Sequence, residues 1–322
     1  MTRVAKHPRS VLVTGAAGFI GSHLCNHLGR GGYRVIALDM PGISWWRLDA
    51  LQVVCQRVHL NLLDRAGVAA LIEDHQPIDC VYHLAAHTDV VRSVELLDDM
   101  IAANIMGTQN FLHACRNKVG RCVVIGTCEE YGDGDVPFSE QQRERAVSPY
   151  SWSKICTTHL AQLYARLFDL PVVVARPFLT YGPLQLSAML VPAAIRAALT
   201  GADFPMTPGE QTRDFNYVND IVAGLIAVGE APDVEGDIFN LATGSEMHVR
   251  DVVSLIYGLC HSSRVPEIGT LPYRRGETMR FYGNATAAHK QLHWHAQTAL
   301  EEGLTHTIAW YRRYLQQGEH AP

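Results

Sequence analysis

Tyr150 and Lys154 are the two residues whose types and spacing most directly suggest chemistry in this sequence. They lie in the segment SPYSWSK at residues 148–154. In a helix, residues four positions apart share one face about one turn apart. A lysine ammonium beside a tyrosine hydroxyl stabilises the phenolate, so such a pair can exchange protons. Taken alone, the pair is equally compatible with two ordinary residues of an amphipathic helix, and the surrounding sequence has to decide.

The segments around this pair alternate between two kinds of apolar pattern. Short apolar runs indicate strands at 10–15, 33–39, 57–60, 79–86, 121–127 and 171–177. Helical spacing of apolar residues is found at 18–32, 65–75, 93–117 and 150–168. Strands that are apolar throughout and alternate with helices are typical of a parallel sheet covered on both faces. The sequence therefore predicts an α/β protein with a doubly wound, Rossmann-type parallel sheet.

The second half of the chain is less regular and richer in proline and glycine. Short strands are expected near 204–206 and 237–241, and helices near 188–200, 218–229, 248–260 and 298–315. We interpret this half as a smaller α/β region that binds substrate and is interleaved with the sheet. The expected domains are a dinucleotide-binding Rossmann domain at 1–182, with segments returning at about 216–242, and a substrate region mainly at 183–322.

Composition narrows the classes of function. Of the 322 residues, 48% are hydrophobic and 18% are charged, which suits a large buried core. A net charge of −5 and the lack of a long apolar run argue against nucleic acid or a membrane as a partner. The eight cysteines are scattered without a C-x-x-C pair, and we see no secretory signal, which indicates the cytoplasm. The 16 histidines show no H-E-x-x-H spacing, so no metal site is expected.

A glycine motif follows the first predicted strand and opens a helix. The segment TGAAGFIG places its glycines at Gly15, Gly18 and Gly21, with Phe19 and Ile20 between the last two. Such a loop lets the backbone approach a pyrophosphate and offers the N–H groups of a helix N-terminus, although a glycine-rich turn can also serve packing alone.

Asp39 supports the binding of a dinucleotide at this motif. It ends the second predicted strand, 18 residues beyond Gly21. A carboxylate there accepts both ribose hydroxyls of NAD and repels the additional phosphate of NADP. No arginine follows Asp39 directly. The predicted cofactor is therefore NAD.

The motifs TGAAGFIGSHL, NLLD, YHLAA, NIMGT, YSWSK and ARPF…YGP occur in this order over nearly the whole chain. In order and spacing they resemble the extended short-chain dehydrogenases/reductases, and among them the NAD-dependent nucleotide-sugar epimerase/dehydratase family. The resemblance implies further cofactor contacts beside those of the glycine motif, Asp39 and the Tyr150–Lys154 pair. They are Asn61 and Leu62 near the adenine, Leu84, Ala85 and Ala86 along the cofactor, Asn104 in a helix that steadies the site, and Pro177 near the nicotinamide.

The same resemblance assigns chemistry to the segment VVIGTCEEYG. Thr127 would hold the reacting sugar oxygen, Tyr150 would exchange its proton, and Lys154 would lower the pKa of the phenol. In sugar dehydratases of this family a carboxylate two residues after the threonine moves the C5 proton, and Glu129 matches that position. Cys128 stands where many dehydratases carry Asp, so the usual acidic pair is incomplete. Glu130 and Tyr131 are expected to shape the loop.

The substrate side rests on fewer residues. By the resemblance, Arg213 in GEQTRDFNYVND and Arg274 in YRRGE would bind the diphosphate, for which two guanidinium groups are well suited. His87 and Thr88 would face the sugar. Leu179 stands where many relatives have Asn and removes an amide from the sugar site.

We therefore expect an enzyme that oxidises a nucleotide sugar at C4 and regenerates its NAD. Glu129 favours a dehydratase of the 4,6 or 5,6 type over a 4-epimerase. A nucleotide uronic acid decarboxylase and a 4-keto-sugar reductase are further alternatives, and a non-catalytic NAD-sensing protein is the alternative of another class. By family habit the protein would be a homodimer, formed through the helices near 95–117 and 150–168.

Overall fold

The computed structural model describes residues 9–185, 188–274 and 276–316. These residues form two compact units. The first contains the described residues up to Gly132, then Arg143–Arg176 and Leu225–Phe239. The second contains Asp133–Gln142, the described part of Pro177–Gly224 and the described residues from Asn240 onward. No motif in the sequence indicated that 133–142 would pack with the second unit.

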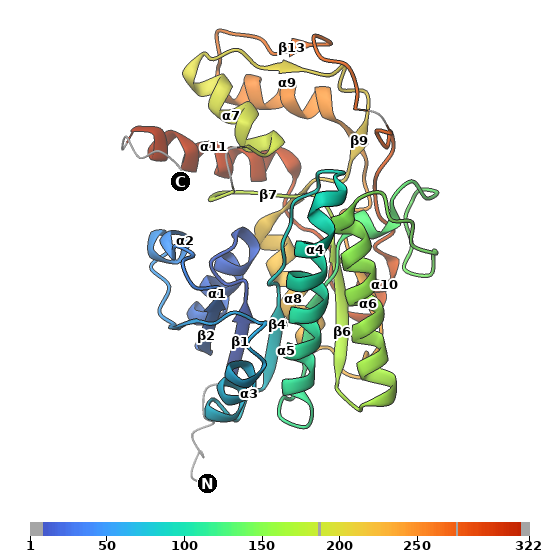
Figure 1. The fold of residues 1–322 in the computed structure, drawn as a ribbon. Coiled ribbons are helices and arrows are strands. Elements are labelled where there is room, and N and C mark those ends of the chain that lie inside the picture. Colours follow the sequence, from blue (N-terminus) through green and yellow to red (C-terminus); the bar gives the residue numbers. More distant parts are fainter. Residues whose placement is uncertain (1–8, 186–187, 275, 317–322) are drawn as a thin grey trace. The chain divides into compact units, whose positions relative to one another are not determined.

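A seven-stranded sheet forms the centre of the first unit (Figure 1). Its strands, in spatial order, are β11 (Ile238–Leu241), β6 (Val172–Pro177), β5 (Cys122–Ile125), β4 (Cys80–His83), β1 (Ser10–Thr14), β2 (Arg34–Asp39) and β3 (Gln56–His59). The pairs from β3 to β6 are parallel, with Val13 opposite Ala37 and Tyr82 opposite Val123, for example. The predicted doubly wound parallel sheet is therefore confirmed, and the carboxyl ends of its strands meet at one edge.

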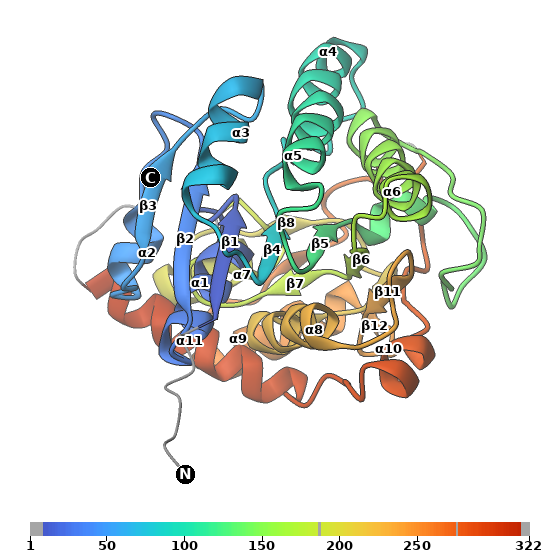
Figure 2. The ribbon, with the colours of Figure 1, turned by 90° about the horizontal axis from the view of Figure 1, so that it is seen from below.

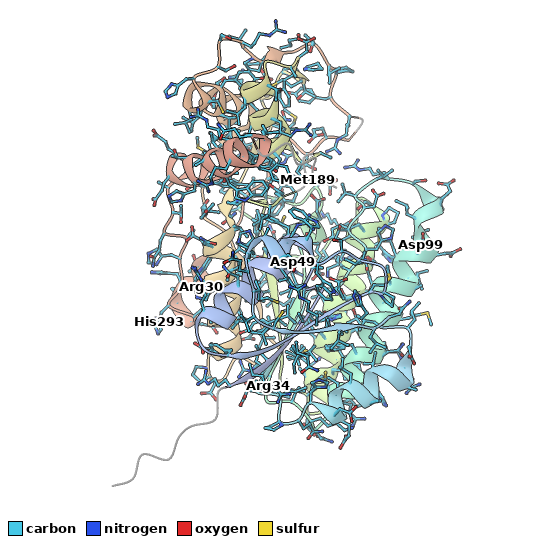
Figure 3. All side chains as sticks on the ribbon, turned by 90° about the vertical axis from the view of Figure 1, so that its left-hand side faces the viewer. Arg30, Arg34, Asp49, Asp99, Met189 and His293 are labelled. Atoms are coloured by element: carbon cyan, nitrogen blue, oxygen red, sulfur yellow. The ribbon has the colours of Figure 1, made fainter. Side chains whose placement is uncertain are left out.

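Helices cover both faces of this sheet (Figure 2). On one face lie α3 (Arg65–Asp74), α5 (Gly107–Cys115) and α6 (Pro149–Leu167), and on the other lie α1 (Phe19–Arg30) and residues 225–230 of α8 (Val218–Glu230). The charged side chains of Arg30, Arg34, Asp49 and Asp99 point outward from this unit (Figure 3).

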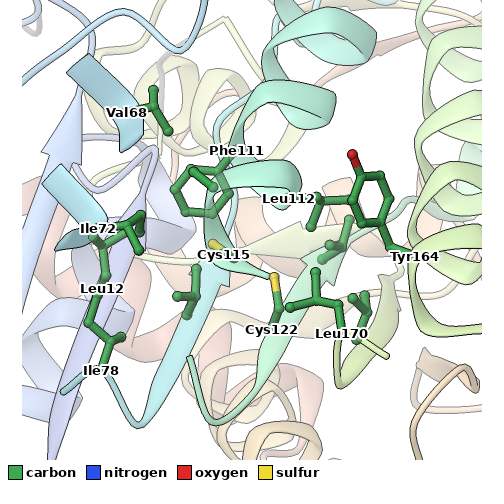
Figure 4. Packing of buried hydrophobic residues seen from close by; sticks show 14 of the residues in the cluster. Leu12, Val68, Ile72, Ile78, Phe111, Leu112, Cys115, Cys122, Tyr164 and Leu170 are labelled. Carbon is green, nitrogen blue, oxygen red and sulfur yellow. The ribbon is translucent and has the colours of Figure 1, made fainter. Parts of the chain in front are cut away.

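Apolar side chains of the strands and of α3, α5 and α6 form the main core (Figure 4). Leu12, Val81, Phe111 and Leu112 are fully buried in it. The side chain of Tyr82, next to Val81, faces the opposite side of the sheet, where its ring lies against Gly229 of α8. This alternation explains why the strands are apolar at nearly every position.

The helical pattern predicted over 93–117 is built from four consecutive helical segments. They are a 3₁₀ turn at Val94–Leu96, α4 (Leu97–Met100), a π-helical stretch at Ile101–Met106, and α5. Two short helices, α2 (Trp46–Ala50) and a 3₁₀ turn at Cys128–Tyr131, were not expected from periodicity.

The second unit is built from helices and two-stranded sheets. Its helices are α7 (Leu190–Thr200), α9 (Val249–Cys260), α10 (Thr286–Gln291) and α11 (Leu300–Gln316). Its strand pairs are β7 (Thr180–Tyr181) with β10 (Asn216–Tyr217), β9 (Thr212–Arg213) with β12 (Met247–His248), and β8 (Pro205–Met206) with β13 (Glu267–Ile268). No helix among the described residues is long and apolar enough to cross a membrane. None of the eight cysteines, all of which are described, forms a disulfide.

The carboxylate of Asp214 connects several segments of the second unit. It is 1% exposed. Its oxygens accept hydrogen bonds from the backbone N–H and hydroxyl of Thr243 and from the N–H groups of Gly244 and Gly283. The Asn216 side chain donates a further bond at 3.0 Å. A buried carboxylate with this many donors fixes the loops that surround it.

Asp214→Ala is expected to destabilise the protein by about 3 kcal/mol, because it leaves several buried donors without an acceptor. Thermal unfolding of the purified variant measures this. The matched control is Asp203→Ala, which removes an exposed carboxylate paired with Arg264 and is expected to leave the unfolding midpoint unchanged. Equal midpoints for the Asp214 variant and the native protein would contradict the account of this unit.

Candidate active site

The glycine loop joins β1 to α1 and lies against the chain that follows β4. Gly15 has a φ of +68°, and a Cβ there would lie 2.8 Å from the backbone nitrogen of Ala85. A Cβ on Gly21 would lie only 2.2 Å from the carbonyl oxygen of Gly15. Gly18 caps the helix, and Phe19 begins it. Only glycine fits at positions 15 and 21, and the loop presents the N-terminus of α1 as an anion site.

Asp39 lies beside this loop, as a ribose-binding carboxylate would. Its Oδ2 accepts the N–H of Ala17 at 2.9 Å, and its Oδ1 accepts the N–H of Met40 at 2.8 Å. These bonds orient the carboxylate and leave further lone pairs for hydroxyl groups. The loop and Asp39 together fit a dinucleotide with free ribose hydroxyls.

Arg47 was not predicted from the sequence. Its side chain is 8% exposed, and its Nη1 donates to the carbonyl oxygen of Ala17 at 3.1 Å. The guanidinium thus packs against the glycine loop from α2, a five-residue helix with no periodic signal. The two tryptophans before Arg47 were the only unusual feature nearby.

The other expected cofactor residues lie at or just after the carboxyl ends of strands. Leu84 and Ala85 donate their N–H groups to the backbone oxygen and the hydroxyl of Thr14, both at 3.1 Å, and Ala86 follows them. The Oδ1 of Asn61 accepts the N–H of Leu63, and the oxygen of Leu62 accepts a bond from Asn110. Pro177 is the last residue of β6.

Helix α6 begins immediately before the tyrosine. The Ser148 hydroxyl caps it by accepting the N–H of Ser151 at 3.0 Å, and Pro149 occupies the first turn. Tyr150 and Lys154 therefore lie on the first turns of a well-defined helix. Lys154 is buried and donates to the carbonyl oxygen of Ile125 at the end of β5.

Burial moves the two pKa values in opposite directions. Loss of water lowers the pKa of Lys154 to about 8, although the Glu130 carboxylate opposes this. Burial also raises the pKa of Tyr150 above its usual value. A hydrogen bond with Thr127 lowers that pKa, whereas the charges of Glu129 and Glu130 raise it further. Burial therefore favours the neutral form of both side chains, so Tyr150 can act as a base only when a positive charge beside it stabilises the phenolate.

The turn after β5 brings the three remaining expected catalytic residues next to Tyr150. Thr127 is 8% exposed, and its hydroxyl also accepts the N–H of Glu129 at 3.3 Å. Cys128 is buried, and Glu129 is half-buried. The structure thus brings together Thr127, Cys128, Glu129 and Tyr150 in the first unit, with Lys154 one turn further along α6.

Asn104 joins the loop after β4 to α6. Its Oδ1 accepts the N–H of His87 at 2.7 Å, and its Nδ2 donates to the carbonyl oxygen of His87 at 3.0 Å and to the Ser153 hydroxyl at 2.8 Å. His87 is half-buried and Thr88 is exposed. The backbone of His87 is therefore fixed relative to the helix that carries Tyr150.

In the second unit, one carboxylate contacts both expected diphosphate ligands. Glu277 pairs with the Nη2 of Arg213, and its Oε2 accepts the Nε–H of Arg274 at 3.0 Å. Arg213 also donates to the carbonyl oxygens of Thr212 and Thr278 at 2.7 and 3.0 Å. Glu277 was not predicted from the sequence. It follows Arg274 by three residues, and that spacing was the one sign of an ion pair between them. The carbonyl oxygen of Leu179 accepts the N–H of Asn216 at 2.8 Å.

Gly21→Ala is expected to weaken NAD binding at least tenfold, because the added Cβ must displace the loop that approaches the pyrophosphate. Calorimetric titration with NAD measures the affinity. Gly258→Ala is the control, since a Cβ in that part of α9 meets open space and alanine favours helix, so affinity should not change. Native affinity in the Gly21 variant would show that this loop does not hold the cofactor.

Comparison with known proteins identifies the family. The sequence model of the NAD dependent epimerase/dehydratase family matches residues 11–242. A UDP-N-acetyl-alpha-D-glucosaminuronate decarboxylase of Bacillus cytotoxicus is 34% identical over 317 residues, covering 94% of this chain and 97% of the relative. A dTDP-glucose 4,6-dehydratase of Shigella flexneri is 31% identical and covers 94% and 92%, respectively.

A solved structure is similar over the same extent. The UDP-glucuronic acid 4-epimerase of Bacillus cereus, in complex with UDP-glucuronic acid and NAD, has a TM-score of 0.86 at 28% identity and covers 95% of this chain and 99% of its own. The relatives' names thus all describe enzymes of nucleotide sugars but differ in the reaction. This chain belongs to the NAD-dependent epimerase/dehydratase family and is an NAD-dependent enzyme that modifies nucleotide sugars.

Proposed function

We propose that the enzyme oxidises a nucleotide-diphosphate sugar at C4 and then eliminates water from the 4-keto sugar, as a sugar-nucleotide dehydratase of the 4,6 or 5,6 type. One observation carries this proposal. Glu129 lies on the same turn as Thr127, and its charge acts on the pKa of Tyr150, so a carboxylate accompanies the tyrosine as a second acid/base. A simple C4 epimerisation does not need that carboxylate.

The first step uses the residues between β5 and α6. Tyr150 takes the proton of the C4 hydroxyl while Thr127 holds the oxygen, and the ammonium of Lys154 stabilises the phenolate form of the tyrosine. Bound NAD supplies the acceptor for the C4 hydride and later returns that hydride. The protein's contribution is to orient the C4 hydroxyl and to move its proton.

The second step belongs to Glu129. The C4 ketone acidifies the neighbouring C5 proton, which the Glu129 carboxylate accepts. The C6 hydroxyl then leaves as water after receiving a proton from protonated Glu129, with the buried Cys128 thiol as a weaker donor beside it. The C5–C6 double bond forms as the C5–H and C6–O bonds break. In a 4,6-dehydratase, hydride then returns to C6 and a proton from solvent is added at C5. In a 5,6-dehydratase, hydride returns to C4 and Tyr150 gives its proton back to the C4 oxygen.

Specific observations favour two other outcomes. Cys128 in place of an acidic residue, together with the structural likeness to a 4-epimerase, favours epimerisation at C4. The 34% identity to a nucleotide uronic acid decarboxylase favours loss of CO₂ from a 4-keto uronic acid. All three reactions share the oxidation at C4 and differ only afterwards.

For the substrate, we propose that Arg213 and Arg274 bind its diphosphate. Both guanidinium groups belong to the second unit and converge on Glu277, so they are close enough to share one anionic ligand. His87, Thr88 and Leu179 are proposed to contact the sugar. The backbone carbonyl of Leu179 already accepts a hydrogen bond from Asn216, and its leucine side chain has no polar atom. Leu179 can therefore offer the sugar only an apolar contact.

We also propose a homodimer formed through α4, α5 and α6. Trp152 of α6 is 38% exposed, and Met106, which immediately precedes α5, is 50% exposed. Large apolar side chains in neighbouring helical segments are the kind of surface that isologous interfaces bury.

The rate of the first step is expected to fall as the pH rises through about 8, because the pKa of Lys154 lies at about 8 and its ammonium is needed. Lys154→Met is expected to lower kcat about 10²–10⁴-fold and to abolish this decline. The pH profile of kcat for both proteins measures it. Lys118→Met, which removes a surface lysine paired with Glu73, should retain the native profile. A native rate that stays level to pH 10 would contradict the role of Lys154.

Mass spectrometry of products formed in deuterated water tests the dehydratase proposal. The native enzyme with a panel of nucleotide sugars is expected to yield a product lighter by one water, with deuterium at C5 if it is of the 4,6 type and without deuterium if it is of the 5,6 type. Glu129→Gln is expected to lose deuterium incorporation, while Glu73→Gln, an exposed surface change, should not. A product of unchanged mass without deuterium would establish the 4-epimerase instead, and loss of CO₂ would establish the decarboxylase.

A further inference from the structure

Glu130 and Arg176 are charged side chains in the interior of the first unit. Both are 0% exposed, whereas other charged residues of this unit, such as Arg34 and Asp99, lie on its surface (Figure 3). Burying full charges is costly unless they are paired and hydrogen-bonded. Such a pair next to proposed catalytic residues calls for a reason beyond the packing of the core.

The Glu130 carboxylate is held by donors from three elements. Its Oε1 accepts the backbone N–H of Thr127 at 2.8 Å. Its Oε2 accepts the Thr158 hydroxyl of α6 at 2.8 Å and lies 2.7 Å from Nη2 of Arg176 on β6. Nη2 of Arg176 also contacts Glu144 at 2.7 Å. The Glu130 side chain therefore connects the turn that carries Thr127 to both α6 and β6.

Thr158 places this carboxylate in line with the catalytic pair. Tyr150, Lys154 and Thr158 follow one another at intervals of four residues and so share one face of α6. The segment around the end of β5 meets each of them in turn, through Thr127, the carbonyl oxygen of Ile125 and Glu130. Thr158 therefore continues the line of proposed functional residues, Tyr150 and Lys154, by one further turn of α6.

We propose that Glu130, held by Arg176 and Thr158, is a positioning residue that fixes the turn carrying Thr127 and Glu129 and supplies a buried negative charge to the Tyr150–Lys154 pair. This inference rests on the proposed function of that pair and goes beyond it. Glu130 does not touch the substrate; it acts through the Thr127 backbone and through its field.

The charged groups around the pair give the direction of this field. Tyr150 is faced by Cys128, Glu129 and Glu130. The negative charges of the two carboxylates raise its pKa, and Glu130 likewise raises the pKa of Lys154. Arg176, Lys154 and two hydrogen bonds favour the ionised form of Glu130 against its burial. Removing the charge of Glu130 should therefore lower the pKa of both Tyr150 and Lys154.

The test replaces Glu130 by Gln in the full-length, NAD-loaded enzyme. The amide can still accept the Thr127 N–H but presents N–H groups to Arg176 and Thr158, so the charge is lost and the turn is loosened. We expect kcat to fall about tenfold or more with KM changed less than about threefold. We also expect the pH profile of kcat to move about one unit toward acid.

A second readout does not depend on any substrate. A fluorinated tyrosine of lower intrinsic pKa at position 150 reports its own titration by fluorine NMR, in the native background and with Glu130→Gln. Its titration is expected to shift about one unit toward acid. Glu235→Gln is the matched control, because it breaks the bond of another mostly buried arginine, Arg121, without contacting the turn. It should move neither readout.

Thr158→Val keeps the inference testable if Glu130→Gln fails to fold. It removes only the hydroxyl donor and leaves both charges paired, and we expect kcat to fall about threefold with an unchanged KM. Native kcat and native titration in whichever variant folds would overturn the inference. If the native enzyme turns over no nucleotide sugar, the proposed function fails, and the fluorine titration still decides the role of Glu130.

Discussion

Glu130 and Arg176 place two full charges inside the first unit, where water cannot solvate either of them. The hydrogen bonds and the ion pair of Glu130 join the turn after β5 to α6 and β6. The backbone of Thr127 is one of the donors, so the position of its hydroxyl follows from this pairing. The geometry of the proposed site thus depends on an electrostatic constraint within the first unit, added to the packing of apolar side chains.

The same interior sets the proton affinities of the proposed catalytic groups. Burial lowers the pKa of Lys154 and raises that of Tyr150, because it makes the ionised state of each side chain less favourable. His83, on β4, remains neutral there, because burial and the Lys154 charge lower its pKa to about 3. Its ring nitrogens bond the hydroxyls of Thr14 and Thr108. His83 therefore adds no positive charge that would disfavour the ammonium form of Lys154.

Much of the first unit could be predicted from the sequence because its signals are local. The apolar strands, the glycine motif and the helical spacing of α6 each depend on neighbouring residues. The strands β7, β9, β10, β12 and β13 were missed because two-residue strands have no periodicity. The pairs Glu130–Arg176 and Arg213–Glu277 join residues 46 and 64 positions apart, so no sequence pattern marked them. The reaction type could not be predicted from the sequence, because dehydratases, epimerases and decarboxylases share the motifs.

We propose above that the residues between β5 and α6 orient a nucleotide sugar so that its C4 hydride passes to bound NAD. Rapid mixing of the NAD-loaded enzyme with a panel of nucleotide sugars, followed by the absorbance of reduced nicotinamide, measures that step directly. We expect a transient absorbance with at least one sugar in the native enzyme and none in Tyr150→Phe, while Tyr164→Phe on the same helix should behave as native. A transient of native size in Tyr150→Phe, or none with any sugar, would contradict it.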